Sequence, residues 1–345
     1  MTPSATARVP ASARLAMDRT GVLVAITALT AIVGIGVGIA IAPNAWAVDA
    51  ERNLRAARDL VAGQFGTDHG YVYSPLAAAL TVPWTWIPQA LAISLWLALR
   101  LGLLAAGTAV ATRGRPAAER LLVFVAVALF VPTLYDLLLG NVSILLAAAV
   151  ALVAWRRDAT WTGIALGLVL ATVPKPQLVP ILIWMLAYRR QALVGTVVTA
   201  AGATGLAALA LGAPAYGAWI AVLRSVDYLS SPMYGNLSLF AFLPGPIALA
   251  AAVAALVASA VALRRGELPG LVACIALGLL IAPYTLAYAA VLLLVALPAL
   301  ATAAPRATVA LALTASLGVI VALPLWLGGV VAAALSAPRD RWPRR

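Results

Sequence analysis

Carboxylates are scarce in this sequence, and one of them is placed where it could act as a base. The chain has 11 acidic residues among 345. Asp49 follows the first apolar run within a few residues, at the expected depth of a membrane–water interface. A carboxylate held there could take a proton from a substrate hydroxyl that enters from the aqueous side. The alternative is structural, because Asp49 precedes the helical-looking stretch 50–62 and could cap its N-terminus.

A single lysine stands out among the basic residues. Lysine and arginine together number 23, and Lys175 is the only lysine. It lies between Pro174 and Pro176, near the predicted outer surface of the membrane. A compact ammonium at this depth suits a phosphate or pyrophosphate group. The alternative is an interfacial lysine that extends its ammonium to the aqueous side at a helix break.

These two residues lie in a chain with the composition of an integral membrane protein. Its residues are 64% hydrophobic and 10% charged, with a mean hydropathy of +1.03. Soluble domains are about 45–50% apolar and about 25% charged, so cytosolic enzymes and nucleic-acid-binding modules are excluded. The net charge of +12 comes from clusters between apolar runs, as in loops of membrane proteins. One cysteine, Cys274, excludes a disulfide framework and a cysteine metal site.

Apolar runs long enough to cross a bilayer predict an all-α bundle of about 10–12 membrane segments. We expect a cytoplasmic N-terminal tail, one transmembrane domain with an outer loop after its first span, and a basic C-terminal tail. A further span is predicted at 89–111, and Pro174–Pro176 separates two apolar pieces that are each too short to cross. We interpret these pieces as a hairpin of short or broken helices. The N-terminal tail is residues 1–20 and the transmembrane domain is residues 21–337, with its outer loop at about 44–75. The C-terminal tail is residues 338–345.

The distribution of arginines predicts the orientation of the chain. Thirteen arginines fall on the predicted inner side and four on the outer side, so the positive-inside rule places the N-terminus in the cytoplasm of a plasma-membrane protein. Arg100 lies near the middle of the predicted 89–111 span. It indicates a cavity, a buried partner, or a span drawn several residues out of place. The predicted inner turns are 113–120, 155–161, 188–191, 264–269 and 304–306.

Several polar motifs, taken in order, resemble glycosyltransferase family 87. The resemblance starts with an early outer-loop acid, Asp49, and continues with Tyr-x-Tyr-x-Pro-Leu at 71–76. Order and spacing are similar to the family over roughly residues 20–300. For the two Asn-x-Ser elements, helix capping is the structural alternative to recognition of sugar hydroxyls. The remaining motifs are Gly140-Asn141-Val142-Ser143, Lys175-Pro176-Gln177, Asn236-Leu237-Ser238-Leu239 and Ala282-Pro283-Tyr284-Thr285.

The resemblance implies a GT-C-like membrane enzyme with its active site on the outer face. It would transfer a sugar, expected to be mannose, from a polyprenyl-phosphate donor to a cell-envelope glycan or glycolipid, with inversion. Asp49 is then the catalytic base and Lys175 binds the donor phosphate. Membrane lipid, the lipid-linked donor and the acceptor are the expected partners, with no nucleic acid, metal or cofactor. Candidates for substrate binding are Tyr71, Tyr73, Asn141, Gln177, Arg224, Asn236, Ser238 and Tyr284.

Two other functions remain open at this point. One is a transporter or flippase of lipid-linked sugars, although a transporter favours charges along a transmembrane path and six of the acids here map to one predicted face. The other is a non-catalytic subunit of an envelope-assembly complex. It is supported by residues 284–289, which contain no acid or histidine, whereas many relatives carry one nearby.

Overall fold

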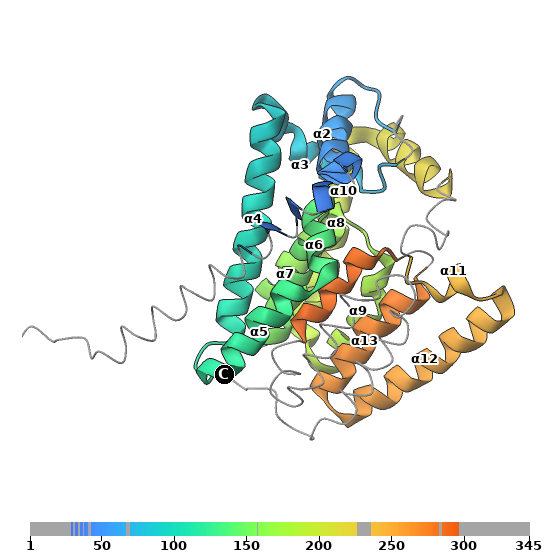
Figure 1. The fold of residues 1–345 in the computed structure, drawn as a ribbon. Coiled ribbons are helices and arrows are strands. Elements are labelled where there is room, and N and C mark those ends of the chain that lie inside the picture. The colour runs from blue at the N-terminus through green and yellow to red at the C-terminus, as the bar shows by residue number, and fades with distance from the viewer. Residues whose placement is uncertain are drawn as a thin grey trace, which may run out of the picture.

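The predicted all-α class is confirmed by the structure, a computed structural model. It describes residues 43–66, 70–156, 158–225, 236–282 and 285–296, together with eight residues between 29 and 40. Every regular element in these ranges is a helix (Figure 1), and the one β-bridge, between Asn236 and Leu286, stands outside any strand. Most of the first predicted span and the last run of the chain lie outside the described residues.

The polar segment after the first predicted span folds into short helices. Its main helix, α2 (Val48–Val61), is amphipathic, because Ala50, Leu54 and Ala57 recur at helical spacing and are buried. Three prolines, Pro75, Pro83 and Pro88, then interrupt the chain before the first long helix begins. The short elements here are η1 (Pro43–Ala45), α3 (Pro75–Thr81) and η2 (Val82–Trp86).

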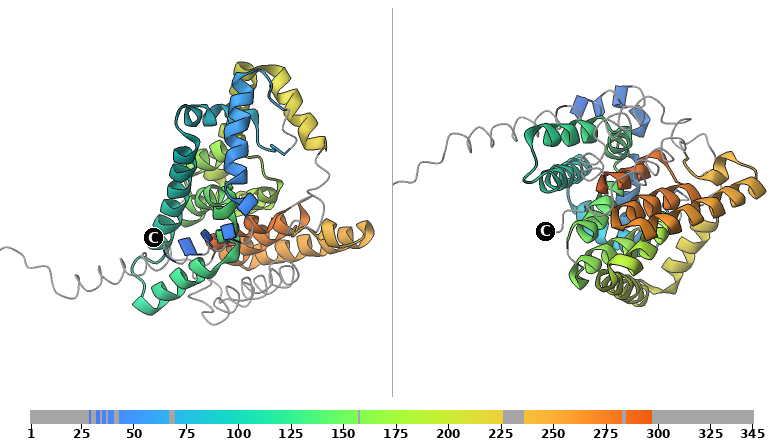
Figure 2. Two further views of the ribbon diagram at one scale, coloured as in Figure 1. Left: turned by 45° about the horizontal axis from the view of Figure 1, so that its top comes forward. Right: turned by 90° about the horizontal axis from the view of Figure 1, so that it is seen from below.

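The remaining helices form the body of the molecule (Figures 1 and 2). Proline or charged residues stand at most of the breaks between them. In chain order they are α4 (Gln89–Ala111), α5 (Ala117–Leu129), α6 (Val131–Leu139), α7 (Ser143–Trp155), α8 (Thr160–Thr172), η3 (Pro176–Leu178), α9 (Val179–Tyr188), α10 (Arg190–Ser225), α11 (Leu239–Phe242), α12 (Gly245–Arg265), α13 (Glu267–Ile281) and η6 (Ala287–Val295).

Helix ends fall where the arginine-rich turns predict them. The predicted span 89–111 coincides with α4, and the short helices predicted around Pro174–Pro176 are α8 and α9. Four of the predicted inner turns each separate two helices, because a charged side chain ends an apolar run. The fifth, 304–306, lies outside the described residues. Which side of the membrane these turns occupy stays a prediction.

Within the described ranges, three helices, α4, α10 and α12, are long and apolar enough to cross a membrane. Much of their surface is exposed and apolar, as at Val198, Leu209 and Val257. The shorter helices α7 and α13 are instead largely buried. An exposed apolar surface of this extent needs lipid around it, so the chain is a membrane protein.

Helices α8 and α10 pack with their backbones in close approach. A Cβ atom on Gly163 would lie 1.8 Å from the Ala192 carbonyl oxygen, and one on Gly195 would lie 2.3 Å from that of Thr160. The Thr196 hydroxyl donates to the Gly163 carbonyl at 3.1 Å across the same contact. Small residues that allow such contact are a general means of joining helices in membranes.

We expect Gly195→Ala to destabilise the protein, because the new methyl group collides with backbone. Overpacking of this kind costs about 1–3 kcal/mol. Gly202→Ala on the same helix is the matched control, since nothing lies within 4 Å of its Cβ position. It should be neutral, or stabilising by about 0.5–1 kcal/mol. Thermal unfolding of both purified variants in one detergent measures the difference, and equal stability would contradict the close packing.

Candidate active site

Asp49 lies in the first turn of α2, with 16% of its side chain exposed. The residue that caps this helix is Ala47, at φ 55°, so the capping role considered for Asp49 is wrong. The Ala47 N–H donates to the Leu138 carbonyl at 2.8 Å. Gly140, at φ +78°, brings its Cα so near that a Cβ there would lie 2.8 Å from Ala50 Cβ. The turn between α6 and α7 therefore packs directly on the start of α2.

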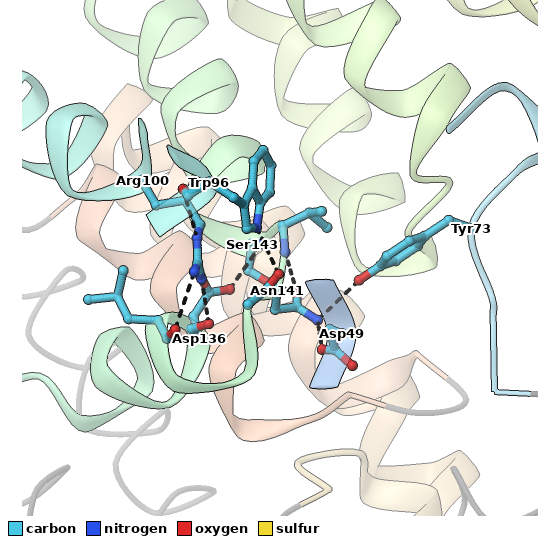
Figure 3. A network of polar contacts seen from close by, with 10 residues as sticks. Asp49, Tyr73, Trp96, Arg100, Asp136, Asn141 and Ser143 are labelled. Carbon is cyan, nitrogen blue, oxygen red and sulfur yellow. Dashed lines mark hydrogen bonds and ion pairs between the residues drawn. The ribbon is translucent and has the colours of Figure 1, made fainter. Parts of the chain in front are cut away.

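That turn carries Asn141, which contacts Asp49 across 92 positions of sequence (Figure 3). Its Nδ2 donates to Asp49 Oδ2 at 2.6 Å and to the Tyr73 hydroxyl at 3.1 Å. Its Oδ1 accepts from the Val142 N–H at 2.8 Å and from Ser143 Oγ at 2.9 Å. Helix α7 begins without a side-chain cap, so capping does not explain Asn141. Its side chain instead joins three segments of the chain.

Arg100 supports the same turn from α4. Its guanidinium lies 3.5 Å from Asp136 Oδ1 and donates to the carbonyls of Asp136 and Leu137, at 2.7 and 3.2 Å. Both charged side chains are at most 1% exposed. The Ser143 N–H donates to Asp136 Oδ2 at 3.0 Å. Of the three explanations open for Arg100, a buried partner is the one observed, and α4 is correctly bounded.

The end of the predicted outer loop is held against α8. Ser74 Oγ donates to the carbonyls of Ala171 and Thr172, at 2.7 and 3.0 Å, and its N–H donates to that of Thr172. The C-terminal half of α10 lies beside this loop (Figure 2), where the Trp219 indole donates to the Val72 carbonyl at 3.2 Å. These bonds fix the backbone on both sides of Tyr73, whose ring is buried.

Lys175 lies three residues after the end of α8, so the same anchoring brings it to Tyr73. Its ammonium lies 5.4 Å from the Tyr73 ring centre and 5.7 Å from that of Tyr288, and the residue is 9% exposed. Among the described residues, no oxygen lies within hydrogen-bonding distance of Nζ. Helix α13 packs closely against the turn that contains Lys175, since a Cβ on Gly278 would lie 1.9 Å from the Gln177 carbonyl oxygen. Lys175 is thus a buried cation faced by two aromatic rings.

Asp49, Tyr73, Asn141 and Lys175 form a first cluster, in which the charged groups shift one another's pKa values. Burial raises the pKa of the Asp49 carboxyl, while the Asn141 amide and the cations Lys175 and Arg52 act against that rise. Burial lowers the pKa of the Lys175 ammonium, opposed by the charge of Asp49. Burial and the nearby Asp49 raise the pKa of Tyr73 well above its ordinary value. Asp49 and Lys175 are thus electrostatically coupled, which suits a base and a phosphate site in one reaction.

Three other candidate residues gather in a second cluster. Asn236 Oδ1 accepts from the N–H groups of Ser238 and Thr285, at 3.0 and 2.9 Å. Ser238 caps α11 by accepting from the Phe240 N–H, which confirms capping at this motif. Gln177 Nε2 donates to Thr285 Oγ1 at 3.3 Å. Through Thr285, this cluster joins the segment before α11 to η3, the turn that follows Lys175.

The structure separates other residues from these clusters and adds new ones. Arg224 is exposed at the C-terminal end of α10, and no interaction found among the described residues links it to Asp49 or Lys175. Tyr284 lies outside the described residues. Sequence reasoning missed Tyr288 and the Arg100–Asp136 pair as parts of the site. The mid-span arginine was the available signal for the pair.

A cavity of about 230 Å³ opens beside the first cluster. Tyr73 and Val142 line it, and α2 contributes Asn53 from the turn after Asp49. Its lining is mostly apolar and includes Trp84 and Trp96. The Trp96 indole donates to the Gly140 carbonyl at 2.9 Å, so this wall is also fixed to the Asn141 turn.

Comparison with known proteins gives one match. The model of glycosyltransferase family 87 matches residues 71–324, well over half of the chain. No curated protein and no solved structure matches the chain.

Proposed function

Because the chain belongs to glycosyltransferase family 87 and is therefore a membrane glycosyltransferase, we propose that it takes a sugar from a polyprenyl-phosphate donor. The acceptor is a cell-envelope glycan or glycolipid on the outer face of the plasma membrane, and the expected sugar is mannose. The observation that carries the proposal is the meeting of a partly buried carboxylate, Asp49, and a buried ammonium, Lys175, around Tyr73.

The proposed reaction is a displacement with inversion. An acceptor hydroxyl oxygen attacks the anomeric carbon from the face opposite the phosphate, while Asp49 takes the hydroxyl proton. The bond between the anomeric carbon and the phosphate oxygen breaks, and polyprenyl phosphate leaves with the bonding electrons. Lys175 stabilises the charge that builds on this phosphate, an electrostatic contribution that is strong in a water-poor site.

Two features of the site support this assignment. The Lys175 ammonium has no hydrogen-bonding oxygen among the described residues and is only 9% exposed, so a phosphate would supply a partner that these residues do not. The apolar cavity beside Tyr73 suits a substrate that combines a polar head with an apolar part. A lipid-linked sugar has both.

The direct test is transfer by the purified protein in lipid nanodiscs. Synthetic polyprenyl-phosphate mannose, glucose and arabinose serve as donors, with extracted membrane glycolipids as acceptors. We expect transfer from one donor, with the anomeric configuration inverted in the product. Movement of the lipid-linked sugar across proteoliposomes without bond formation would favour a transporter instead. Neither transfer nor movement with any donor would favour the non-catalytic subunit.

Topology provides an independent prediction about where the site lies. Ala62, just after α2, and Ala117, at the start of α5, are both exposed, so only the membrane distinguishes them. Cysteine at position 62 should react with an impermeant thiol reagent in intact cells, and cysteine at position 117 only after permeabilisation. The native Cys274 is buried and contributes little background. Labelling of position 117 in intact cells would overturn the orientation and the outer-face site.

A further inference from the structure

The orientation of the Asn141 side-chain amide is fixed by its neighbours. Two donors, the Val142 N–H and the Ser143 hydroxyl, point at Oδ1. An amide oxygen accepts and an amide nitrogen donates, so the NH₂ group must face the other way, toward Asp49 and Tyr73. Asn141 is 1% exposed and Ser143 is 2% exposed, which leaves little room for water to replace either bond.

The support continues behind Ser143. Its N–H donates to Asp136 Oδ2, and Asp136 is paired with Arg100 inside the molecule. A chain of contacts therefore runs from α4 through the start of α7 to the carboxylate on α2 (Figure 3). A rigid second layer of this kind is what holds a reacting group in one geometry.

We propose that Asn141 is a positioning residue for the base: its NH₂ group holds Asp49 Oδ2, keeps that carboxylate ionised, and leaves Oδ1 to receive the acceptor proton. This inference rests on the proposed function for its catalytic meaning. It replaces substrate binding as the role of Asn141, because all of the amide's contacts are already made within the protein.

The charged and titratable groups that face Asp49 come from several elements. Arg52 on α2 lies 3.8 Å from Asp49 Oδ1, and the charges of Lys175 and Arg100 also favour the ionised form of Asp49. Asp136, Tyr73 and Tyr135 are the titratable groups that the charge of Asp49 reaches. Asn141 is the neutral donor in this set. Its removal therefore changes the protonation of Asp49 without removing a charge from the site.

Labelling of Asp49 with dicyclohexylcarbodiimide tests the proposal without needing turnover, because this apolar reagent reacts with protonated carboxyl groups. Mass spectrometry of the full-length protein in nanodiscs gives the labelled fraction at each pH. A charge-assisted hydrogen bond corresponds to about one to two pH units. In Asn141→Ala, half-labelling of Asp49 should therefore occur about one to two pH units higher. The acid limb of transferase activity should shift by the same amount.

Asn141→Asp separates positioning from packing. It keeps the size of Asn141 and its bonds from Val142 and Ser143, but places a carboxylate where the donor was. Because two close carboxyl groups raise the pKa of one, this isosteric variant should shift Asp49 labelling further than Asn141→Ala does. A packing role predicts the reverse order, with loss of folded protein in the alanine variant and little change in the aspartate variant.

Gln89→Ala is the matched control. It also removes an amide bonded to an α2 carboxylate, Glu51, at 3.1 Å, but on an exposed surface, so it should leave Asp49 labelling unchanged. Asp59 gives an internal reference within each sample. Unshifted Asp49 labelling in both Asn141 variants would overturn the proposal. If Asp49→Asn retained full transfer while the shift occurred, the proposed base would fail and the hydrogen-bond assignment would stand.

Discussion

Asp49→Asn should reduce the rate of sugar transfer by about 10²–10⁴-fold, the usual contribution of a general base. Asparagine keeps the size of the side chain but cannot take a proton. As the pH is lowered, the wild-type rate should begin to fall at a higher pH than it would with an exposed aspartate as the base, because burial raises the pKa of Asp49. Below that pKa the carboxyl group is protonated and cannot act as a base. The measurement is kcat/KM against pH, with the donor that gives turnover.

Asp59→Asn is the matched control for this experiment. Asp59 lies on the same helix and is partly exposed, so we expect its replacement to change the rate little. Folded protein is compared by size-exclusion chromatography of each variant, because the Asn141 contact to position 49 is altered. Near-normal turnover of Asp49→Asn at equal protein level would eliminate Asp49 as the base.

Lys175→Ala should lower kcat/KM by roughly ten- to hundred-fold, since a hydrogen bond to a charged group contributes about 1.5–3 kcal/mol. Both donor binding and kcat should fall, because negative charge increases on the phosphate as it leaves. The acid limb of the pH profile should also move upward, since the Lys175 charge opposes the rise in the Asp49 pKa. Full activity of the alanine variant at equal expression would remove Lys175 from the site.

Lys175→Arg distinguishes a phosphate site from a membrane anchor. Burial lowers the pKa of Lys175, so wild-type activity should fall as the pH rises through that pKa and the ammonium loses its proton. Arginine stays charged, so this alkaline limb should move to higher pH in the variant. Its planar fork must still fit between Tyr73 and Tyr288, so only partial activity is expected at neutral pH. A simple interfacial anchor predicts full activity with arginine and an unchanged alkaline limb.

The sequence by itself determined the class of protein and many of the helix ends. In a chain with 64% hydrophobic residues, the apolar surface must be buried inside the protein or covered by lipid. A pair of arginines interrupts an apolar run, because two adjacent charges are costly in lipid. The ends of α7 and α12 lie at such pairs, and α4 ends two residues before Arg113. Prolines around Lys175 likewise determined a break, because proline lacks the N–H that a helix interior needs. The order of the polar motifs identified the family.

Only the tertiary structure decided which polar residues meet. Arg100 could be recognised as unusual, but its pairing with Asp136 depends on how α4 packs on α6. Asn141 resembled a helix cap, and its contact with Asp49 exists because Gly140 lets the α6–α7 turn touch α2. Gln177 and Asn236 stand near Lys175 in the motif order, yet both side chains form hydrogen bonds with Thr285. Such contacts depend on the close approach of distant backbones, and a spacing along the chain carries no record of that distance.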